Sequence, residues 1–467
     1  MSLRRPNGFI SAGFNPLEVP NAPTIGTATT AGPTAVSVTF TAPSNVGGSA
    51  ITGYVATAKK TSDGTTISGT GSSSPVTVSG LTTGTAYTVT VAAVNSFGLG
   101  LSSAASNSVT PLAQQLFNWG YNSSGELGIN NTSNRSSPVQ VGSDGDWSKT
   151  TAGGGFNLAI KTNGTLWAWG SNAAGRLGLG DTVNRSSPVQ VGALTTWADI
   201  VAGASHCIAI KTDGTAWSWG NGAQGKLSQN NSADYSSPKQ IGTSTNWSKA
   251  AAGTYNTALI SASGGLWICG LGVYGVNGLN NVYGQNFIQS VSSGWSDISF
   301  GARFALARKT NGTMWAWGNN TQGQIGLNNA INYSSPVQIG ALTTWSKIAT
   351  GDSFSFDSAR AIKTDGTLWA WGDNFRGQLG FSNTYDYSSP KQVGALTTWA
   401  AVAAGALFTR AIKTDGTLWT WGTNDSGQLG IGNTTYRSSP VQVGALTTWS
   451  VLPSGGAGVS SPTIKTS

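Results

Sequence analysis

Few residues of this chain could carry out acid–base, nucleophilic or metal chemistry. The 467 residues include one histidine, His206, and two cysteines, Cys207 and Cys269. A zinc site, a cysteine–histidine pair or a Ser-His-Asp triad would each have to use His206. That histidine lies at the expected start of a strand, and we interpret it as a packing or surface residue. The cysteines are expected to be buried free thiols, with a disulfide between them as the alternative.

The carboxylates do not form a recognisable catalytic set. Several aspartates occupy Asp-Gly turns, where a structural role suffices. Asp144 and Asp146 flank Gly145 and could bind a cation, but a calcium loop needs more oxygen ligands at fixed positions. No acidic pair stands outside the repeat pattern as a glycosidase pair would. The sequence therefore predicts a protein that is not an enzyme and that holds no metal and no cofactor.

Charge is sparse in this sequence. Charged residues make up 9% of the chain and the net charge is +8, whereas an average soluble domain has about 25% charged residues. Basic residues never run longer than two, as in Arg4-Arg5 and Lys59-Lys60, so no nucleic-acid partner is expected. No stretch of 18 apolar residues exists and residues 1–19 lack an apolar core, so neither membrane insertion nor a signal peptide is predicted.

A sharp change of composition divides the chain. All 19 tryptophans lie at or beyond position 119. We expect a tail at 1–18, one domain at 19–112, a linker at 113–115 and a second domain at 116–467.

The second domain is built from repeats. A Trp-Gly pair recurs at intervals of 48 to 54 residues, and Cys269-Gly270 fills one gap. A second tryptophan series runs in parallel. Its members are Trp147, Trp197, Trp247, Trp295, Trp345, Trp399 and Trp449. Seven units of this length indicate a propeller, a solenoid or an array.

Each unit has the alternation of a β-hairpin. In Ile210–Trp219 two alternating runs surround Asp213-Gly214, which predicts a type I′ turn. The chain stops at Ile464–Ser467, where the next turn is due, and the first unit starts at Leu116, just after a missing turn. Each end thus carries the half-hairpin that the other lacks. Pairing of the two ends would leave no open edge, so we predict a closed seven-bladed β-propeller.

These units resemble regulator-of-chromosome-condensation repeats. The segments 169–191 and 421–443 share Trp-Gly, a Gly-x-Leu-Gly a few residues later, and Pro-x-x-Val. The resemblance covers about three quarters of the chain and implies a seven-bladed propeller closed by its two ends. The fourth unit departs from the pattern, with Cys269 in place of tryptophan and Val276-Asn277-Gly278 in place of the Leu-Gly motif.

Residues 19–112 contain short runs in which apolar and polar residues alternate, and this pattern predicts a β-sandwich. The stretch Gly80–Val89 resembles the tyrosine corner of fibronectin type III domains, and Phe40 stands where that family often has tryptophan. The expected fold is therefore all-β: an immunoglobulin-like, fibronectin type III sandwich followed by the closed propeller.

Binding residues are sought where side chains suited to interfaces recur or where the repeat is broken. Tyrosine or arginine precedes Ser-Ser-Pro in six units and would form a ring on one face, with either a structural or an interface role. The fourth unit carries aromatic residues in unusual loops, and extra residues lengthen the turn at 351–360. The candidates are Arg135, Arg185, Tyr235, Tyr333, Tyr387 and Arg437 in the ring, Tyr274, Tyr283 and Phe287 in the fourth unit, and Phe354 and Phe356 in the long turn.

The tail is the third candidate. Eighteen residues do not fold alone, and large apolar groups in a free tail would be a liability, so we expect it to dock on a partner. The residues expected to dock are Arg4, Arg5, Phe9, Ile10, Phe14 and Leu17.

The whole arrangement resembles virion structural proteins of tailed bacteriophages, particularly marine ones. A docking tail, a sandwich and a polar, weakly charged propeller follow one another, and the opening FISAGFNPLEVPNAPTIGTAT is similar to the start of such proteins. The resemblance implies a non-enzymatic virion protein, present in several copies, that the tail and sandwich attach to other virion proteins. The propeller would contact host envelope glycans or proteins, or brace neighbouring subunits. The alternative is a cellular protein–protein interaction propeller of scaffold or inhibitor type.

Overall fold

The computed structural model describes residues 18–279, 285–290, 293–352, 356–455 and 458–466. The chain forms two compact units, which divide between Ala113 and Gln114. Strands and three short 3-10 turns make up the regular structure of the described residues, in agreement with the predicted all-β class. Within these residues no helix is long and apolar enough to span a bilayer.

The first unit is a sandwich of two antiparallel sheets with strand orders β1-β2-β5 and β4-β3-β6-β7. Its strands are β1 (Thr24–Thr30), β2 (Ala35–Thr41), β3 (Gly53–Lys60), β4 (Thr66–Gly71), β5 (Val76–Ser79), β6 (Tyr87–Asn95) and β7 (Gly98–Ser102). Alternate residues of these strands face a common core, in which Phe40 packs on Tyr54 with ring centroids 4.6 Å apart. The hydroxyl of buried Tyr87 accepts a hydrogen bond from the Thr82 amide at 3.1 Å, which is the expected tyrosine corner.

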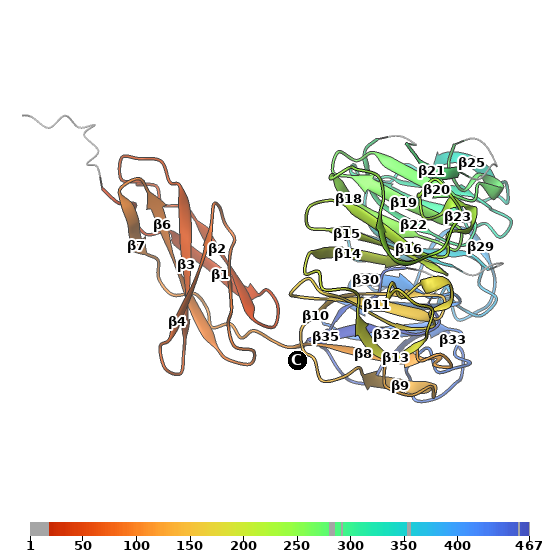
Figure 1. Cartoon of the computed structure of the whole chain (residues 1–467), viewed down its shortest axis with the longest axis horizontal. Helices are drawn as coiled ribbons and strands as arrows, with labels where there is room; N and C mark the ends of the chain where they lie inside the picture. Colours follow the sequence, from red (N-terminus) through yellow and green to blue (C-terminus); the bar gives the residue numbers. More distant parts are fainter. Residues whose placement is uncertain (1–17, 280–284, 291–292, 353–355, 456–457, 467) are drawn as a thin grey trace, which may run out of the picture. The chain divides into compact units, whose positions relative to one another are not determined.

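The second unit consists of seven four-stranded antiparallel sheets, which are the blades of a propeller (Figure 1). We number the blades 1 to 7 by their Trp-Gly or Cys-Gly pair. Blade 1 contains β34 (Trp449–Val451), β35 (Thr463–Thr466), β8 (Gln114–Gly120) and β9 (Arg135–Gln140). Blade 2 contains β10 (Trp147–Gly153), β11 (Phe156–Lys161), β12 (Leu166–Gly170) and β13 (Arg185–Gln190). Blade 3 contains β14 (Trp197–Ala202), β15 (His206–Lys211), β16 (Ala216–Gly220) and β17 (Tyr235–Gln240).

The remaining four blades repeat this order. Blade 4 contains β18 (Trp247–Ala252), β19 (Asn256–Ser261), β20 (Leu266–Gly270) and β21 (Gln285–Ser290). Blade 5 contains β22 (Trp295–Phe300), β23 (Phe304–Lys309), β24 (Met314–Gly318) and β25 (Tyr333–Gln338). Blade 6 contains β26 (Trp345–Gly351), β27 (Ser358–Lys363), β28 (Leu368–Gly372) and β29 (Tyr387–Gln392). Blade 7 contains β30 (Trp399–Ala404), β31 (Phe408–Lys413), β32 (Leu418–Gly422) and β33 (Arg437–Gln442). The 3-10 turns η1 (Ala173–Gly175), η2 (Ala223–Gly225) and η3 (Val273–Gly275) follow β12, β16 and β20.

The ring closes as the two chain ends predict. The last strand, β35, pairs antiparallel with the first propeller strand, β8, so that Ile464 lies opposite Leu116 (Figure 1). Strand β8 begins at Gln114, inside the segment 113–115 that the sequence suggested as a linker.

The Trp-Gly tryptophans join each blade to the one before it. Each of these indoles is fully buried, and in five blades its Nε1–H donates to a main-chain carbonyl of the preceding blade at 2.8–3.0 Å. In blade 4 the thiol of Cys269 takes the same place, with its sulfur 3.5 Å from the Lys226 carbonyl oxygen. Val276 keeps the acceptor role in the atypical motif, because its carbonyl receives the Trp317 N–H. The sequence signature therefore marks contacts between blades.

The hairpin turn differs from the predicted type I′. Gly214 has φ +76°, but Asp213 is not among the residues with positive φ. The Gly214 amide donates to the Lys211 carbonyl and the Lys211 amide donates to the Thr215 carbonyl, both at 2.9 Å. This is a type I turn followed by a glycine bulge. The Asp213 carboxylate accepts hydrogen bonds from the Thr215 amide and hydroxyl at 2.9 and 2.7 Å. These hydrogen bonds explain why an aspartate occupies this position although its φ is not positive.

Candidate binding surfaces

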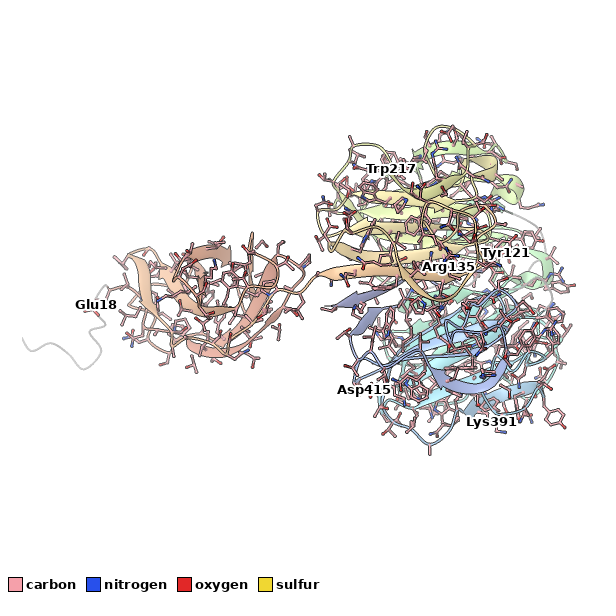
Figure 2. All side chains as sticks on the ribbon, turned by 90° about the horizontal axis from the view of Figure 1, so that it is seen from below. Glu18, Tyr121, Arg135, Trp217, Lys391 and Asp415 are labelled. Carbon is pink, nitrogen blue, oxygen red and sulfur yellow. The ribbon has the colours of Figure 1, made fainter. Side chains whose placement is uncertain are left out.

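The six predicted ring residues occupy one structural position. Each is the first residue of the outermost strand of its blade and pairs with the glycine of the Trp-Gly motif, as Arg135 does with Gly120. All six are half-buried. They therefore surround the rim at the end of the blades opposite the Asp-Gly turns, and Figure 2 shows Tyr121 and Arg135 near that end and Asp415 at the other. We call the six positions the rim ring.

The polar ends of several rim-ring side chains are held by loop and strand residues of their own blades. The Tyr387 hydroxyl accepts from Asn383 at 3.1 Å and from Lys391 at 2.9 Å, and its ring packs edge-on against Phe381. Tyr235 is held in the same way by Asn231 and Lys239 at 3.0 Å. The lysine hydrogen bond lowers the pKa of both phenols. Arg185 forms an ion pair with Asp181 at 2.6 Å. These side chains are thus held in a set orientation before any partner binds.

The other described candidates make local contacts. Tyr274 is the central residue of η3 with φ +60°, and the Arg303 guanidinium lies 5.6 Å from its ring centroid. A pocket of about 170 Å³ opens beside this pair. Phe356 packs on Phe375, with ring centroids 4.6 Å apart.

The remaining candidates fall where the structure says nothing of the side chains. Tyr283, Phe354 and the tail residues Arg4, Arg5, Phe9, Ile10, Phe14 and Leu17 lie outside the described residues. Phe287 belongs to β21, whose side chains are not described. Their proposed roles stay predictions.

The histidine, the cysteines and the two aspartates that the sequence analysis considered for catalysis or metal binding have structural roles in the described part of the chain. His206 is fully buried, its Nε2 lies 2.9 Å from the Thr257 hydroxyl, and burial holds its pKa well below its usual range. Cys207 and Cys269 are both buried and free, as predicted. Asp144 and Asp146, which the sequence suggested as cation ligands, form ion pairs with Lys161 at 2.8 and 3.2 Å. Among the described residues no three His, Cys, Asp or Glu side chains gather as metal ligands.

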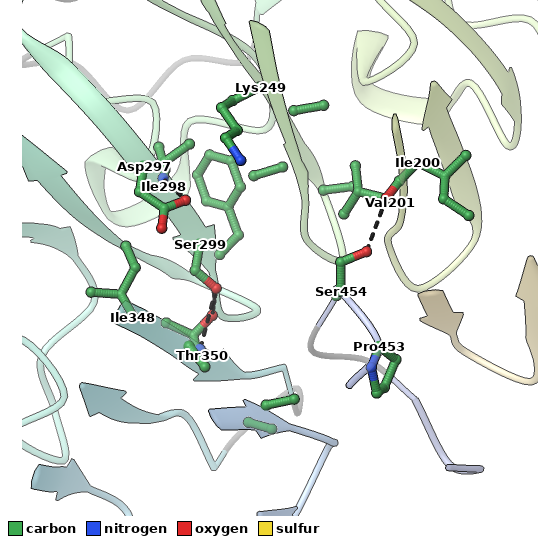
Figure 3. Close-up of a pocket in the computed structure, with 18 of the residues that line it drawn as sticks. Ile200, Val201, Lys249, Asp297, Ile298, Ser299, Ile348, Thr350, Pro453 and Ser454 are labelled. Atoms are coloured by element: carbon green, nitrogen blue, oxygen red, sulfur yellow. Dashed lines mark hydrogen bonds between the residues drawn. The ribbon is translucent and has the colours of Figure 1, made fainter. Parts of the chain in front are cut away.

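A pocket lies between innermost strands of the ring. Its space of about 230 Å³ is lined by the innermost strands of blades 3 to 7 and by Pro453–Gly455 (Figure 3). Ser454 crosses towards blade 3, where its hydroxyl donates to the Ile200 carbonyl at 2.9 Å, and Ser299 bonds Thr350 at 2.7 Å. Residues Pro453–Gly455 therefore form part of the pocket wall.

A buried polar cluster lies past the end of the innermost strands. Asp352 belongs to the long turn of blade 6, and one carboxylate oxygen accepts from the Thr254 hydroxyl of blade 4 at 2.6 Å. Its other oxygen is buried and has no hydrogen-bond partner among the described residues. Burial raises the pKa of Asp352 to about 7, and burial lowers the pKa of nearby Lys226 to about 8. Lys226 donates to the Ser205 hydroxyl at 2.9 Å. Asp352 thus links blade 6 to blade 4.

Sequence reasoning missed an alternation of charge on the innermost strands. The second residue after each tryptophan of the second series is charged in five consecutive blades, as in Trp197 and Asp199. These residues are Lys149, Asp199, Lys249, Asp297 and Lys347. Lys149 pairs with Asp199 across two blades at 2.8 Å, and burial raises the pKa of Asp297 although neighbouring cations oppose the shift. The signal was present at a fixed distance from each tryptophan.

These features define an all-β protein with a seven-bladed propeller and a sandwich domain, and the family can now be stated. The sequence profile of the regulator of chromosome condensation (RCC1) repeat matches residues 114–160, 163–210, 213–260, 311–356, 365–412 and 415–457. A second profile of the same repeat matches parts of four units, and the fibronectin type III profile matches residues 21–109. The RCC1 matches cover more than half of the chain, which therefore belongs to the RCC1 repeat family.

Solved structures share the propeller fold. Human WBSCR16 is 19% identical with a TM-score of 0.67, over 76% of this chain and 99% of that one. Yeast RCC1 (Prp20) bound to Kap60 is 18% identical with a TM-score of 0.68, over 76% and 89%. The structure of Prp20p from Saccharomyces cerevisiae is 17% identical with a TM-score of 0.65, over 76% and 91%. No curated protein sequence matches this chain. Propellers of this type are typically interaction or exchange-factor scaffolds, and the combination with a fibronectin type III domain suggests a protein-interaction propeller.

Proposed function

We propose that this chain is a non-enzymatic structural protein of a tailed-bacteriophage particle. In this proposal residues 1–18 and the sandwich attach several copies to other virion proteins. The propeller presents the rim ring to the host surface or to neighbouring subunits. The observation that carries the binding role is the rim ring itself: six equivalent positions hold Tyr or Arg, the residue types that dominate interface energies. Because loop contacts already orient them, little side-chain freedom is lost on binding.

The particle assignment is tested by locating the protein. Antibodies against residues 116–467 would be used for immunogold electron microscopy on a lysate of the producing culture. Gold on particles supports the proposal, and its position separates a head protein from a tail protein. Deleting residues 1–18 is then expected to abolish incorporation while the propeller remains folded. Gold confined to soluble cytoplasm contradicts the assignment.

The rim ring is tested separately by attachment to host cells. The variant Tyr333→Ala/Tyr387→Ala removes two neighbouring ring members. Its matched control is Leu342→Ala/Leu396→Ala, which changes exposed side chains at the opposite end of the blades. We expect weaker attachment for the tyrosine variant and unchanged attachment for the control, at comparable melting temperatures. Equal attachment of both variants removes the rim ring as the contact surface.

The second candidate is a cellular interaction propeller. Fold similarity favours it, since one neighbour, yeast RCC1 (Prp20), was solved bound to Kap60. In this case loss of residues 1–18 would change little, and the antibody would label the cell rather than particles.

A further inference from the structure

Blade 4 has an open cleft between two tryptophans where other blades hold a lysine. In blade 3, Lys211 ends the second strand, and its ammonium lies 5.1 Å from the ring centroid of Trp197 and 3.7 Å from that of Trp217. Four further blades place a lysine between two indoles in this way, and in blade 1 Lys465 lies 5.3 Å from the ring of Phe117. The four further lysines are Lys161, Lys309, Lys363 and Lys413.

Blade 4 keeps both indoles, Trp247 and Trp267, but has Ser261 in place of the lysine. Ser261 lies opposite Trp247 in the register position that Lys211 has opposite Trp197. The rings of Trp247 and Trp267 are 6.1 Å apart at 86°, close to the 6.1 Å and 81° of Trp197 and Trp217. Trp247 is half-buried, whereas its counterparts in the other six blades are at most 3% exposed. The serine therefore leaves an indole surface uncovered.

The cleft differs from its counterparts in lining rather than in size. Its volume is about 580 Å³, and pockets of about 550 and 420 Å³ lie at the equivalent places of blades 1 and 7, where the lysine is present. Only the blade 4 pocket reaches the position of the missing lysine, at Ser261, and among the described residues its lining has no charged side chain, whereas the other two include Arg437 and Lys391. Gly265 replaces a threonine whose hydroxyl accepts the outer indole N–H in five blades, as Thr215 does for Trp217 at 3.0 Å. Trp267 therefore lacks the hydroxyl acceptor that its counterparts have.

The other blades show what such a pair of rings holds. The negative faces of indole rings attract cations. Among the described residues Lys211 has no carboxylate within ion-pair distance, so the two rings are its close partners. We propose that the Trp247–Trp267 cleft binds a lysine side chain of a partner protein, because lysine is the side chain that five other blades hold between the corresponding rings. This site does not depend on the particle assignment above.

The experiment measures binding of small cations to the full chain. The probes are choline, Nα-acetyl-lysine methylamide and 3,3-dimethylbutan-1-ol, the uncharged isostere of choline, followed by the indole N–H signals in NMR titrations. Trp267→Phe assigns the signal of the cleft. We expect saturable millimolar binding of the cations and binding of the alcohol weaker by about tenfold. Tighter binding of the lysine probe supports a protein partner, and tighter binding of choline would overturn that assignment in favour of a choline-type headgroup.

Two matched variants make the test specific. Ser261→Lys restores the side chain found in the other six blades and should weaken cation binding by about tenfold or more. Lys211→Ser should open a second cleft in blade 3 and add a second binding event at Trp217. Both substitutions exchange residues that sister blades already accommodate at this position. Absence of saturable cation binding, equal binding of the neutral alcohol, or no effect of Ser261→Lys would each overturn the proposal.

Discussion

Ile464 in the last strand lies opposite Leu116 in the first propeller strand, and both side chains are fully buried. The two residues are almost 350 positions apart in the sequence, yet they belong to one core cluster with Trp147 and Trp169 of the next blade. Closure of the ring therefore buries apolar surface as well as pairing main-chain groups. The stability of the whole propeller depends on this junction, because an open ring would expose two sheet edges.

We predict that Ile464→Ala destabilises the chain by about 2–4 kcal/mol, because truncating a buried isoleucine removes packing and leaves a cavity. Urea unfolding followed by tryptophan fluorescence measures this change. Leu446→Ala is the control, since Leu446 is 44% exposed, and it should change stability by less than about 0.5 kcal/mol. Equal effects of the two variants would contradict a role for this junction.

The carbonyl contacts of the Trp-Gly tryptophans allow a paired prediction. Trp371 donates its indole N–H to the Gln324 carbonyl at 2.9 Å. In the next blade the Trp421 N–H has no acceptor within the described part of the chain, because the Gln378 carbonyl is taken by Arg360 and Thr409. Replacement of either tryptophan by phenylalanine removes similar ring volume, but only Trp371→Phe leaves a buried carbonyl unpaired.

We therefore expect Trp371→Phe to cost about 1–2 kcal/mol more than Trp421→Phe in unfolding free energy. Chemical denaturation of the two variants side by side gives this difference. A larger loss for Trp421→Phe would mean that ring packing, rather than the hydrogen bond, distinguishes the two sites.

The blades and their closure could be predicted from the sequence. Both depend on the spacing of the Trp-Gly pairs and on the apolar–polar alternation within strands, and both patterns are visible in the residues themselves. The Trp-Gly spacing set the repeat, and the half-hairpins at Leu116 and Ile464 indicated how the ends meet. The turn type was wrong because Asp-Gly suits two kinds of hairpin turn. Only the Asp213–Thr215 hydrogen bonds, which depend on the path of the next strand, distinguish them.

The candidate sites were predictable to the extent that they repeat. The rim ring was predictable because tyrosine or arginine recurs at one position of the repeat. Tyr235 and Arg185, for example, have the same strand register in their blades. The contact between Asp352 and Thr254 was not predictable, because it joins two blades that are not neighbours and depends on an insertion found once. The cleft of blade 4 could have been found from the sequence, because Ser261 interrupts a column of lysines.

The turn geometry predicts different tolerances at Asp213. Two units carry asparagine at the equivalent position, and Asn163 and Asn311 accept the same two threonine hydrogen bonds through their side-chain oxygens. Asp213→Asn should therefore change stability by less than about 0.5 kcal/mol. Asp213→Ala removes both bonds, and we expect a loss of about 1–2 kcal/mol. Thermal unfolding of the two variants measures the difference, and equal melting temperatures would show that Gly214 alone sets the turn.

The buried carboxyl of Asp352 predicts a pH dependence of stability. Its pKa is about 7 in the folded chain, whereas an unfolded aspartate has a pKa of about 3.9. Between these values the folded state keeps a proton that the unfolded state loses, so stability contributed by Asp352 is full below pH 4 and is lost as the pH rises through 7. Lys226, the nearby cation, has a folded pKa of about 8 and titrates mainly above this interval.

Asp352→Asn removes the titration while keeping an oxygen that can accept from the Thr254 hydroxyl. We expect the variant to match the natural chain at pH 4 and to be more stable at pH 8 by up to about 4 kcal/mol, the free-energy equivalent of the shifted pKa. Urea unfolding at the two pH values measures the difference. Asp297→Asn is the control, because Asp297 is another propeller carboxyl but has cations close by. Its effect on stability should differ less between pH 4 and pH 8, since Lys249 and Lys347 oppose the upward shift of its pKa. If Asp352→Asn shifts stability equally at pH 4 and pH 8, burial does not raise the pKa of Asp352 above its unfolded value, and the predicted pH dependence is wrong.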